Sequence, residues 1–188
     1  MIHTIMNIPH QPVGSLETIG IIGVQADGSD ISAIEDLILK YGPSDWNYVP
    51  EEAIREHLAG IATGTVLAIL AFSKPKQLIV GVATYEIGHR YPQHQPPGRV
   101  GAAHGYIAEV VVHADFAGRG IGSFLLGSAV QDLANGGMHE VYAKRHADNV
   151  PSRRMMEKVG FILVDEFDDP DIRTTGSRRT AVMRYALV

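Results

Sequence analysis

The stretch with the clearest chemical potential runs from Tyr106 to Leu126, YIAEVVVHADFAGRGIGSFLL. Its first seven residues are largely apolar and rich in β-branched side chains, which is typical of a buried strand. A turn that contains Gly118 and Gly120 follows, and apolar residues then recur at helical spacing from Ile121. The first N–H groups of a helix have no partner inside it and lie at the positive end of its dipole. The spacing therefore predicts a strand, a glycine loop and a helix that together bind an anion such as a phosphate.

The two common nucleotide-binding loops do not fit this stretch. A P-loop needs Gly-Lys-Ser/Thr at the start of the helix, and the chain has Gly120-Ile121-Gly122-Ser123 without a lysine. The dinucleotide fingerprint G-x-G-x-x-G needs a third glycine, but Ser123 or Leu125 occupies that position. The anion bound here is therefore expected to belong to another kind of cofactor.

The whole chain excludes several classes of protein. It has 188 residues without cysteine, so one domain is expected and disulfides, thiolate ligands and a cysteine nucleophile are excluded. A net charge of −5 argues against a nucleic-acid-binding domain. No apolar run approaches a membrane span and the N-terminus lacks a secretory signal, so we expect a cytoplasmic protein without a membrane partner. The spacings of His89, His94 and His104 match no known ligand pattern, and we expect no metal site.

The hydrophobic pattern predicts seven strands and four helices in an order that keeps them in one unit. Residues 1–16 are predicted to be an extended arm, and residues 88–104, rich in proline and glycine, a loop that contacts substrate. Asp30 or Ser29 is expected to cap the first helix, and Asn149 or Asp148 the last. The predicted strands cover residues 18–25, 65–72, 77–87, 106–112, 140–145, 161–167 and 180–187, and the helices follow residues 30, 50, 120 and 149.

A second motif lies in the last third of the chain, N-x-x-S followed by a helix and E-K-x-G-F. Its residues are Asn149, Ser152, Glu157, Lys158, Gly160 and Phe161. The glycine loop resembles the pattern Gln/Arg-x-x-Gly-x-Gly/Ala, with Gly120 and Gly122 at the small positions and Ala117 where Gln or Arg is usual. Together the two motifs and the order of elements over residues 18–187 resemble the GNAT acetyltransferases.

This resemblance implies an α/β (α+β) GNAT fold. Its mixed, mostly antiparallel sheet would have about six to seven strands flanked by about four helices, and would be splayed between the fourth and fifth strands. The single domain would cover residues 1–188.

The resemblance also implies acetyl-CoA as the cosubstrate. Its pantetheine would pair with the fourth strand and its pyrophosphate would lie on the glycine loop, where Ala117 still supplies a backbone N–H. Five cations, Lys144, Arg145, Arg153, Arg154 and Lys158, are candidates to meet its 3′-phosphate. The cofactor-binding residues that we predict are Val110, Val111, Val112, Ala117, Gly118, Arg119, Gly120, Ile121, Gly122, Ser123, Asn149, Ser152 and Arg154.

The implied reaction is direct attack of an amine on the thioester. An alkyl ammonium with a pKa of about 10.4 must lose a proton first, and Glu109 in the central strand is the candidate base. GNAT enzymes commonly protonate the leaving thiolate with a tyrosine, and Met156 occupies that position here. Tyr142, Ser152 and Tyr106 are candidate substitutes, and Glu109, Tyr142 and Ser152 are the predicted catalytic residues.

These inferences predict an N-acetyltransferase that acts on a primary amine, either a small molecule or a protein N-terminus or lysine. The alternatives are a GNAT-fold acyl-CoA-binding or regulatory domain that has lost catalysis, supported by Met156, and a nucleotide-binding protein. An acidic group is expected to attract a cationic amine; its members are Asp165, Glu166, Asp168, Asp169 and Asp171. The acceptor, the acyl group and the oligomeric state, for which a homodimer is one option, stay open.

Overall fold

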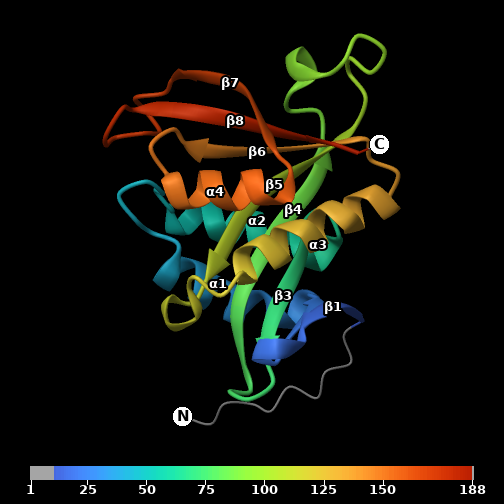
Figure 1. The fold of residues 1–188 in the computed structure, drawn as a ribbon, viewed down its shortest axis with the longest axis vertical. Helices are drawn as coiled ribbons and strands as arrows, with labels where there is room; N and C mark the ends of the chain where they lie inside the picture. The colour runs from blue at the N-terminus through green and yellow to red at the C-terminus, as the bar shows by residue number, and fades with distance from the viewer. Residues whose placement is uncertain (1–10, 188) are drawn as a thin grey trace.

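One sheet of eight strands organises the computed structural model, which describes residues 11–187 (Figure 1). Its order is β1-β2-β3-β4-β5-β6-β8-β7, and every neighbouring pair is antiparallel except β5 and β6, which run parallel. The strands are β1 Pro12–Leu16, β2 Ile21–Gln25, β3 Leu67–Ser73, β4 Leu78–Gly88, β5 His104–Val112, β6 Glu140–His146, β7 Ile162–Asp168 and β8 Arg179–Ala186. The helices are α1 Ile31–Tyr41, α2 Glu51–Thr63, α3 Ile121–Asn135 and α4 Val150–Val159.

The mixed sheet with four flanking helices confirms the predicted fold. The strand count is higher than the six to seven expected, because Pro12–Leu16 pairs with β2 instead of lying free as part of an arm. The rest of that arm, residues 1–10, lies outside the described part of the chain. A proline and a glycine in this short edge strand hide its extended character from a pattern search.

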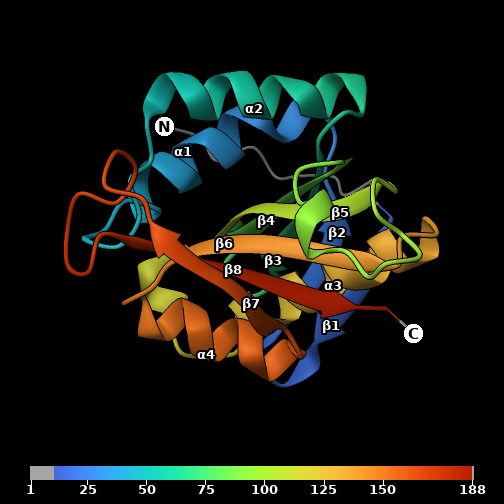
Figure 2. The same ribbon diagram turned by 90° about the horizontal axis from the view of Figure 1, so that it is seen from above.

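Two pairs of helices cover the two faces of the sheet (Figure 2). On one face α1 and α2 bury Ile34, Leu58 and neighbouring residues against β2, β3, β4 and Val111 of β5. On the other face α3 and α4 bury Leu125 and Met156 against β3 to β6 and β8. Because side chains alternate along a strand, the helices on each face receive every second residue of the strands between them.

On the face that carries α1 and α2, the part of the sheet formed by β5, β6 and β8 is covered by the segment between β4 and β5 and not by a helix. There Tyr91, from the segment between β4 and β5, packs on Tyr106, Tyr142 and Val182. The Gln95 amide of the same segment donates to Glu140 Oε2 at 3.0 Å. The proline- and glycine-rich stretch thus packs on the sheet, and its role as a substrate loop stays a prediction.

The caps of two helices test the local interpretation of the sequence. Asp30 is the N-cap residue of α1, as predicted, but its side chain makes no cap hydrogen bond to this helix. The capping box belongs to the short turn Gly28–Asp30 before it, where Asp27 Oδ1 accepts from Ser29 N at 2.7 Å. Asn149 caps α4 as predicted, since its Oδ1 accepts from Ser152 N at 3.0 Å.

The parallel pair opens within the sheet. Gly105–Ile107 of β5 pairs with Val141–Ala143 of β6, and the strands then separate although each continues, to Val112 and His146. This confirms the predicted splay, which lies between the fourth and fifth of the strands expected from the sequence. The separated strands leave two backbone edges facing an open space.

Candidate active site

A cavity of about 480 Å³ occupies the opening between β5 and β6. Residues 107–112 of β5 and 144–146 of β6 form its walls, the loop before α3 and the start of α4 close one side, and the α1–α2 loop closes another. Most of the predicted site residues line it: Glu109, Val110, Val111, Val112, Ala117, Gly118, Gly120, Ile121, Gly122, Ser123, Asn149 and Ser152. The fold therefore brings both predicted motifs to one place.

The glycine loop presents a row of unpaired backbone donors. Gly118 and Gly120 have φ of 74° and 82°, in the left-handed region that favours glycine, and α3 begins directly after them. No acceptor within the described residues takes the N–H groups of residues 118–123. A Cβ on Gly122 would lie 2.8 Å from Met155 Sδ, so this glycine lets α3 approach α4. Donors and helix dipole together form the arrangement that an anion site needs.

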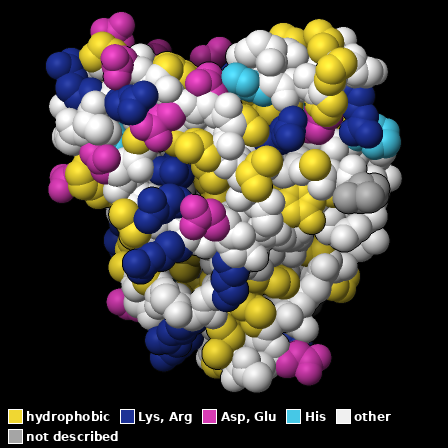
Figure 3. Space-filling view, turned by 45° about the horizontal axis from the view of Figure 1, so that its top comes forward, with side chains coloured by type: hydrophobic (Ala, Val, Ile, Leu, Met, Phe, Trp, Pro, Cys, Tyr) yellow, Lys and Arg dark blue, Asp and Glu magenta, His cyan; other side chains and the backbone are white. Residues whose placement is uncertain are grey.

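Two predicted cofactor residues lie outside the cavity wall. The Arg119 guanidinium lies 5.1 Å from the centre of the Phe116 ring and donates to the Asp115 carbonyl at 3.0 Å. Arg154 is exposed on α4. Figure 3 shows Lys and Arg side chains gathered on the left of the visible face, where α4 lies in Figure 1. Any contact of these arginines with a cofactor would be made from the rim.

The free edge of β5 determines which backbone groups face the opening. His113 N donates to Val80 O at 2.9 Å, and β4 pairs residue by residue with β5 up to Val112. Because backbone groups alternate along an antiparallel strand, those of Val111 point to β4, and those of Val110 and Val112 point away from it. Of the three valines predicted to pair with the pantetheine, only Val110 and Val112 can therefore pair with an extended ligand.

Glu109 lies beside a bulge in β5. Thr84 of β4 pairs with Glu109 and Tyr85 pairs with Ile107, so Ala108 is an extra residue on β5. The half-buried carboxyl lines the cavity, and burial raises its pKa to about 7, although Asn47 and Arg173 act in the opposite direction. A carboxyl with this pKa is partly ionised at neutral pH, as a general base must be.

The predicted hydroxyl groups are separated by the fold. Ser152 lines the cavity from the first turn of α4, near Met156, which is 4% exposed and lines it too. Tyr142 and Tyr106 belong to the aromatic group under the β4–β5 segment and do not line the cavity. The Tyr142 hydroxyl is buried without a hydrogen-bond partner among residues 11–187. Of the predicted proton donors, only Ser152 is brought to the cavity.

Sequence reasoning missed several residues of the wall. Tyr41, at the end of α1, lines the cavity, and its hydroxyl lies 2.7 Å from His113 Nε2. Trp46 and Asn47 come from the α1–α2 loop, and Arg173 from the β7–β8 loop. The composition of these loops contains no motif. The only feature of the sequence that could have indicated these wall residues is that their loops adjoin the ends of helices and strands.

His89 and His104 have hydrogen-bond partners of their own, and His94 lies beside an acidic side chain. Tyr91 N donates to His104 Nε2 at 3.2 Å, burial lowers the pKa of His104, and His94 Nε2 lies 3.4 Å from Asp165 Oδ2. Within residues 11–187, no three histidine or acidic side chains are grouped so that they could hold a metal ion. No described helix has the length and apolar character needed to cross a membrane.

Solved structures share this fold at low sequence identity. Arabidopsis thaliana NAA60 in complex with acetyl-CoA aligns with a TM-score of 0.70 and 15% identity over 88% of this chain and 98% of that one. The ribosomal-protein-S5-alanine acetyltransferase of Vibrio fischeri gives 0.67 and 14% over 89% and 93%. A mosquito arylalkylamine N-acetyltransferase-like protein gives 0.69 and 12% over 89% and 100%. No curated protein matches the chain in sequence.

The fold of the chain is thus similar to that of these acetyltransferases. The model of the acetyltransferase (GNAT) family matches residues 31–161. The chain belongs to the GNAT acetyltransferase family.

Proposed function

We propose that this protein is an N-acetyltransferase that transfers the acetyl group of acetyl-CoA to a primary amine. The observation that carries the proposal is a single cavity, which reaches both the free N–H groups of residues 118–123 and the Glu109 carboxyl. A cofactor on one side of the β5–β6 opening and a base on the other side both face the space in which the acetyl group would be transferred. The complex of Arabidopsis NAA60 with acetyl-CoA supports the choice of cofactor.

The cofactor would be held mainly by backbone groups. Its pyrophosphate would accept hydrogen bonds from the N–H groups of residues 118–123 at the N-terminus of α3. Its pantetheine would lie along β5 as an added strand and pair with Val110 and Val112. The start of α4, with Asn149 and Ser152, borders the same space.

Glu109 would take the proton that the amine must lose. The free amine nitrogen attacks the thioester carbonyl, the new C–N bond forms and the C–S bond breaks. Coenzyme A leaves as a thiolate, and the second proton that the nitrogen loses passes to water. Side chains alternate along β5, so Glu109 projects on the same face as Val111, which packs against α1 and α2. An amine that enters from this face meets the base before the thioester.

The departing thiolate needs no tyrosine. A thiol has an ordinary pKa of about 8.5, so the thiolate is a tolerable leaving group near neutral pH. Met156 cannot donate a proton, and Ser152 is a hydroxyl on the same wall. The absent tyrosine also favours the second candidate, an acyl-CoA-binding or regulatory domain without catalysis.

Incubation of the purified protein with acetyl-CoA and a panel of primary amines separates the two candidates. Release of free thiol together with a mass increase of one acetyl group on an amine is the expected result. Binding of acetyl-CoA without turnover of any amine would favour the regulatory candidate. Better protection against heating by ATP or NAD than by coenzyme A would contradict both.

A further inference from the structure

Two cations line the cavity on the side away from the glycine loop. Lys144 lies on β6, two residues after Tyr142, and therefore projects from the same face of the sheet as this tyrosine. Arg173 comes from the β7–β8 loop and also lines an adjoining hollow with Trp46. The helices α3 and α4 pack on the opposite face. The two cations thus face the amine, not the cofactor phosphates.

Neither cation forms an ion pair with an acidic side chain of the described residues, although the charge of Asp169 acts on both. Arg173 is only 8% exposed, and its Nε donates to Thr180 Oγ1 at 2.9 Å, which holds the guanidinium in place. Within the described chain, no aspartate or glutamate forms an ion pair with Arg173 or Lys144. Burial lowers the pKa of both groups. The charge of Arg173 lowers the pKa of Lys144 further, whereas Asp169 acts in the opposite direction on both groups. A buried guanidinium such as that of Arg173, without an ion pair to an acidic side chain, is costly, and an anionic ligand would relieve that cost.

The acidic residues that the sequence suggested for a cationic amine do not line the cavity, although Asp169 accepts from the Thr180 hydroxyl at 2.7 Å and thus lies behind Arg173. Glu166 and Asp168 pair with Arg179 at 2.7 and 3.3 Å. Among the described residues that line the cavity, Glu109 is the one acidic side chain. The charge on this side of the cavity thus consists of one base and two cations.

We propose that the acceptor carries a carboxylate close to its amino group, as an amino acid does, and that Lys144 and Arg173 bind this carboxylate. With the carboxylate held there, the amino group would face Glu109 from the same side of the sheet. A guanidinium fixed at Nε can offer its remaining N–H groups to a carboxylate in a forked geometry. This inference rests on the proposed function, because it names the substrate class of that site.

The kinetic test compares L-amino acids with the amines left after removal of their carboxylate, such as phenylalanine with phenethylamine. We expect the amino acid of a productive pair to be preferred at least tenfold in kcat/KM. In Lys144→Gln and Arg173→Gln the ratio should fall by roughly ten- to a hundredfold, the value of one or two charge-assisted hydrogen bonds. Lys144 is exposed and makes no recorded hydrogen bond, so its variant should fold even where Arg173→Gln does not.

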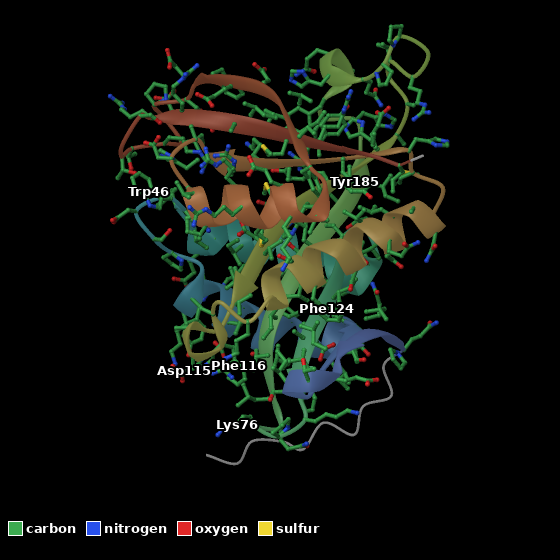
Figure 4. The ribbon with its side chains drawn as sticks, viewed as in Figure 1. Trp46, Lys76, Asp115, Phe116, Phe124 and Tyr185 are labelled. Atoms are coloured by element: carbon green, nitrogen blue, oxygen red, sulfur yellow. The ribbon has the colours of Figure 1, made fainter. Side chains whose placement is uncertain are left out.

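A binding test does not depend on turnover. Trp46 is the one tryptophan of the chain and lines both the cavity and the hollow at Arg173, so its fluorescence reports ligands there. N-acetylated amino acids, the proposed products, should change this signal at lower concentration than their amides. Lys144→Gln should abolish the difference, and Lys76→Gln, in the β3–β4 turn far from Trp46 (Figure 4), should preserve it.

The two tests fail in different ways. Equal binding of acids and amides, or a preference for amines without a carboxylate that Lys144→Gln does not alter, would overturn the inference and leave the N-acetyltransferase proposal intact. Selective binding of the acids without acetylation of any amine would support the anion site and overturn the proposed reaction.

Discussion

Ile107 of β5 pairs with Ala143 of β6, and no residue beyond them joins the two strands. Both strands continue past this pair, so their edges keep backbone groups free to bind a ligand. The bulge at Ala108 comes directly after Ile107 and re-aims Glu109 at the same opening. The loss of one strand pairing thus creates the cavity and places the candidate base at its wall.

Replacing Glu109 with Gln should remove the base. We expect kcat to fall by about 10² to 10⁴, the usual contribution of a positioned base. With a pKa of about 7, the wild-type rate should rise between pH 6 and 8 as Glu109 loses its proton. In the variant only the rise due to the amine itself should be left. Initial rates of thiol release across this pH range measure both effects.

An exposed glutamate provides the control. Glu56 on α2 forms no recorded ion pair and does not line the cavity. Glu56→Gln should keep the wild-type rate and pH profile. A Glu109→Gln enzyme as active as this control would show that another group, or water, accepts the proton.

The same variant should change how stability depends on pH. Burial raises the pKa of Glu109 from 4.5 to about 7, so ionisation is harder in the folded protein than in the unfolded chain. The carboxyl therefore destabilises the fold progressively as pH rises from about 4.5 to 7, and this effect is absent below that interval. Glu109→Gln should have a higher Tm than the wild type at pH 8 and nearly the same Tm at pH 4. Thermal unfolding at the two pH values tests this, and equal Tm differences would contradict the buried, raised pKa.

Much of this arrangement was readable from the sequence because it follows local rules. The glycines before α3 and the cap at Asn149 depend on backbone geometry near in sequence, and they lie where the motifs predicted. Arg173 could not be predicted, because its place on the cavity depends on how the β7–β8 loop folds back over β6. The place of Tyr142 could not be predicted for a similar reason, since the alternation along β6 turns its side chain into the aromatic group and away from the cavity.

The left-handed conformation of Gly120 should matter for cofactor binding. A side chain at φ 82° costs roughly 1–2 kcal/mol, and a Cβ there would project into open space where we place the pyrophosphate. Gly120→Ala should therefore bind coenzyme A about tenfold or more weakly by calorimetry. Gly127→Ala is the matched control, since Gly127 lies inside α3 with open space at its Cβ and should gain helix stability without loss of affinity. Equal affinities of the two variants would place the phosphates elsewhere.

A tyrosine at Met156 should not accelerate the reaction. The thiolate leaves without a proton in the proposed mechanism, so Met156→Tyr and Met156→Phe should show the same turnover at every pH. Both side chains are larger than methionine at a site that is 4% exposed, and the pair therefore isolates the hydroxyl from the change in bulk. A selective gain for the tyrosine variant above pH 7 would show that protonation of the thiolate limits the wild-type enzyme.

Gly176 should control the junction between the α1–α2 and β7–β8 loops. The Thr175 hydroxyl donates to the Asp45 carbonyl, and a Cβ on Gly176 would clash with Asp148 Oδ2 and would lie 2.6 Å from the Trp46 ring. Gly176→Ala should displace Trp46, shift its fluorescence and raise KM for the amine. Gly101 also has a left-handed φ, of 84°, but its Cβ would meet nothing within 4 Å.

Comparison of the two alanine variants separates backbone strain from the clash. Both should lose roughly 1–2 kcal/mol of stability because of their left-handed φ, and Gly176→Ala should lose about 1–3 kcal/mol more through the clash with Asp148 and Trp46. Only this variant should affect the amine, because Trp46 lines the cavity and the segment around Gly101 does not. Equal Tm values and equal KM values for the two variants would show that the position of Trp46 does not depend on its contact with Gly176. The wall on the amine side would then be shaped by β6 and not by this junction.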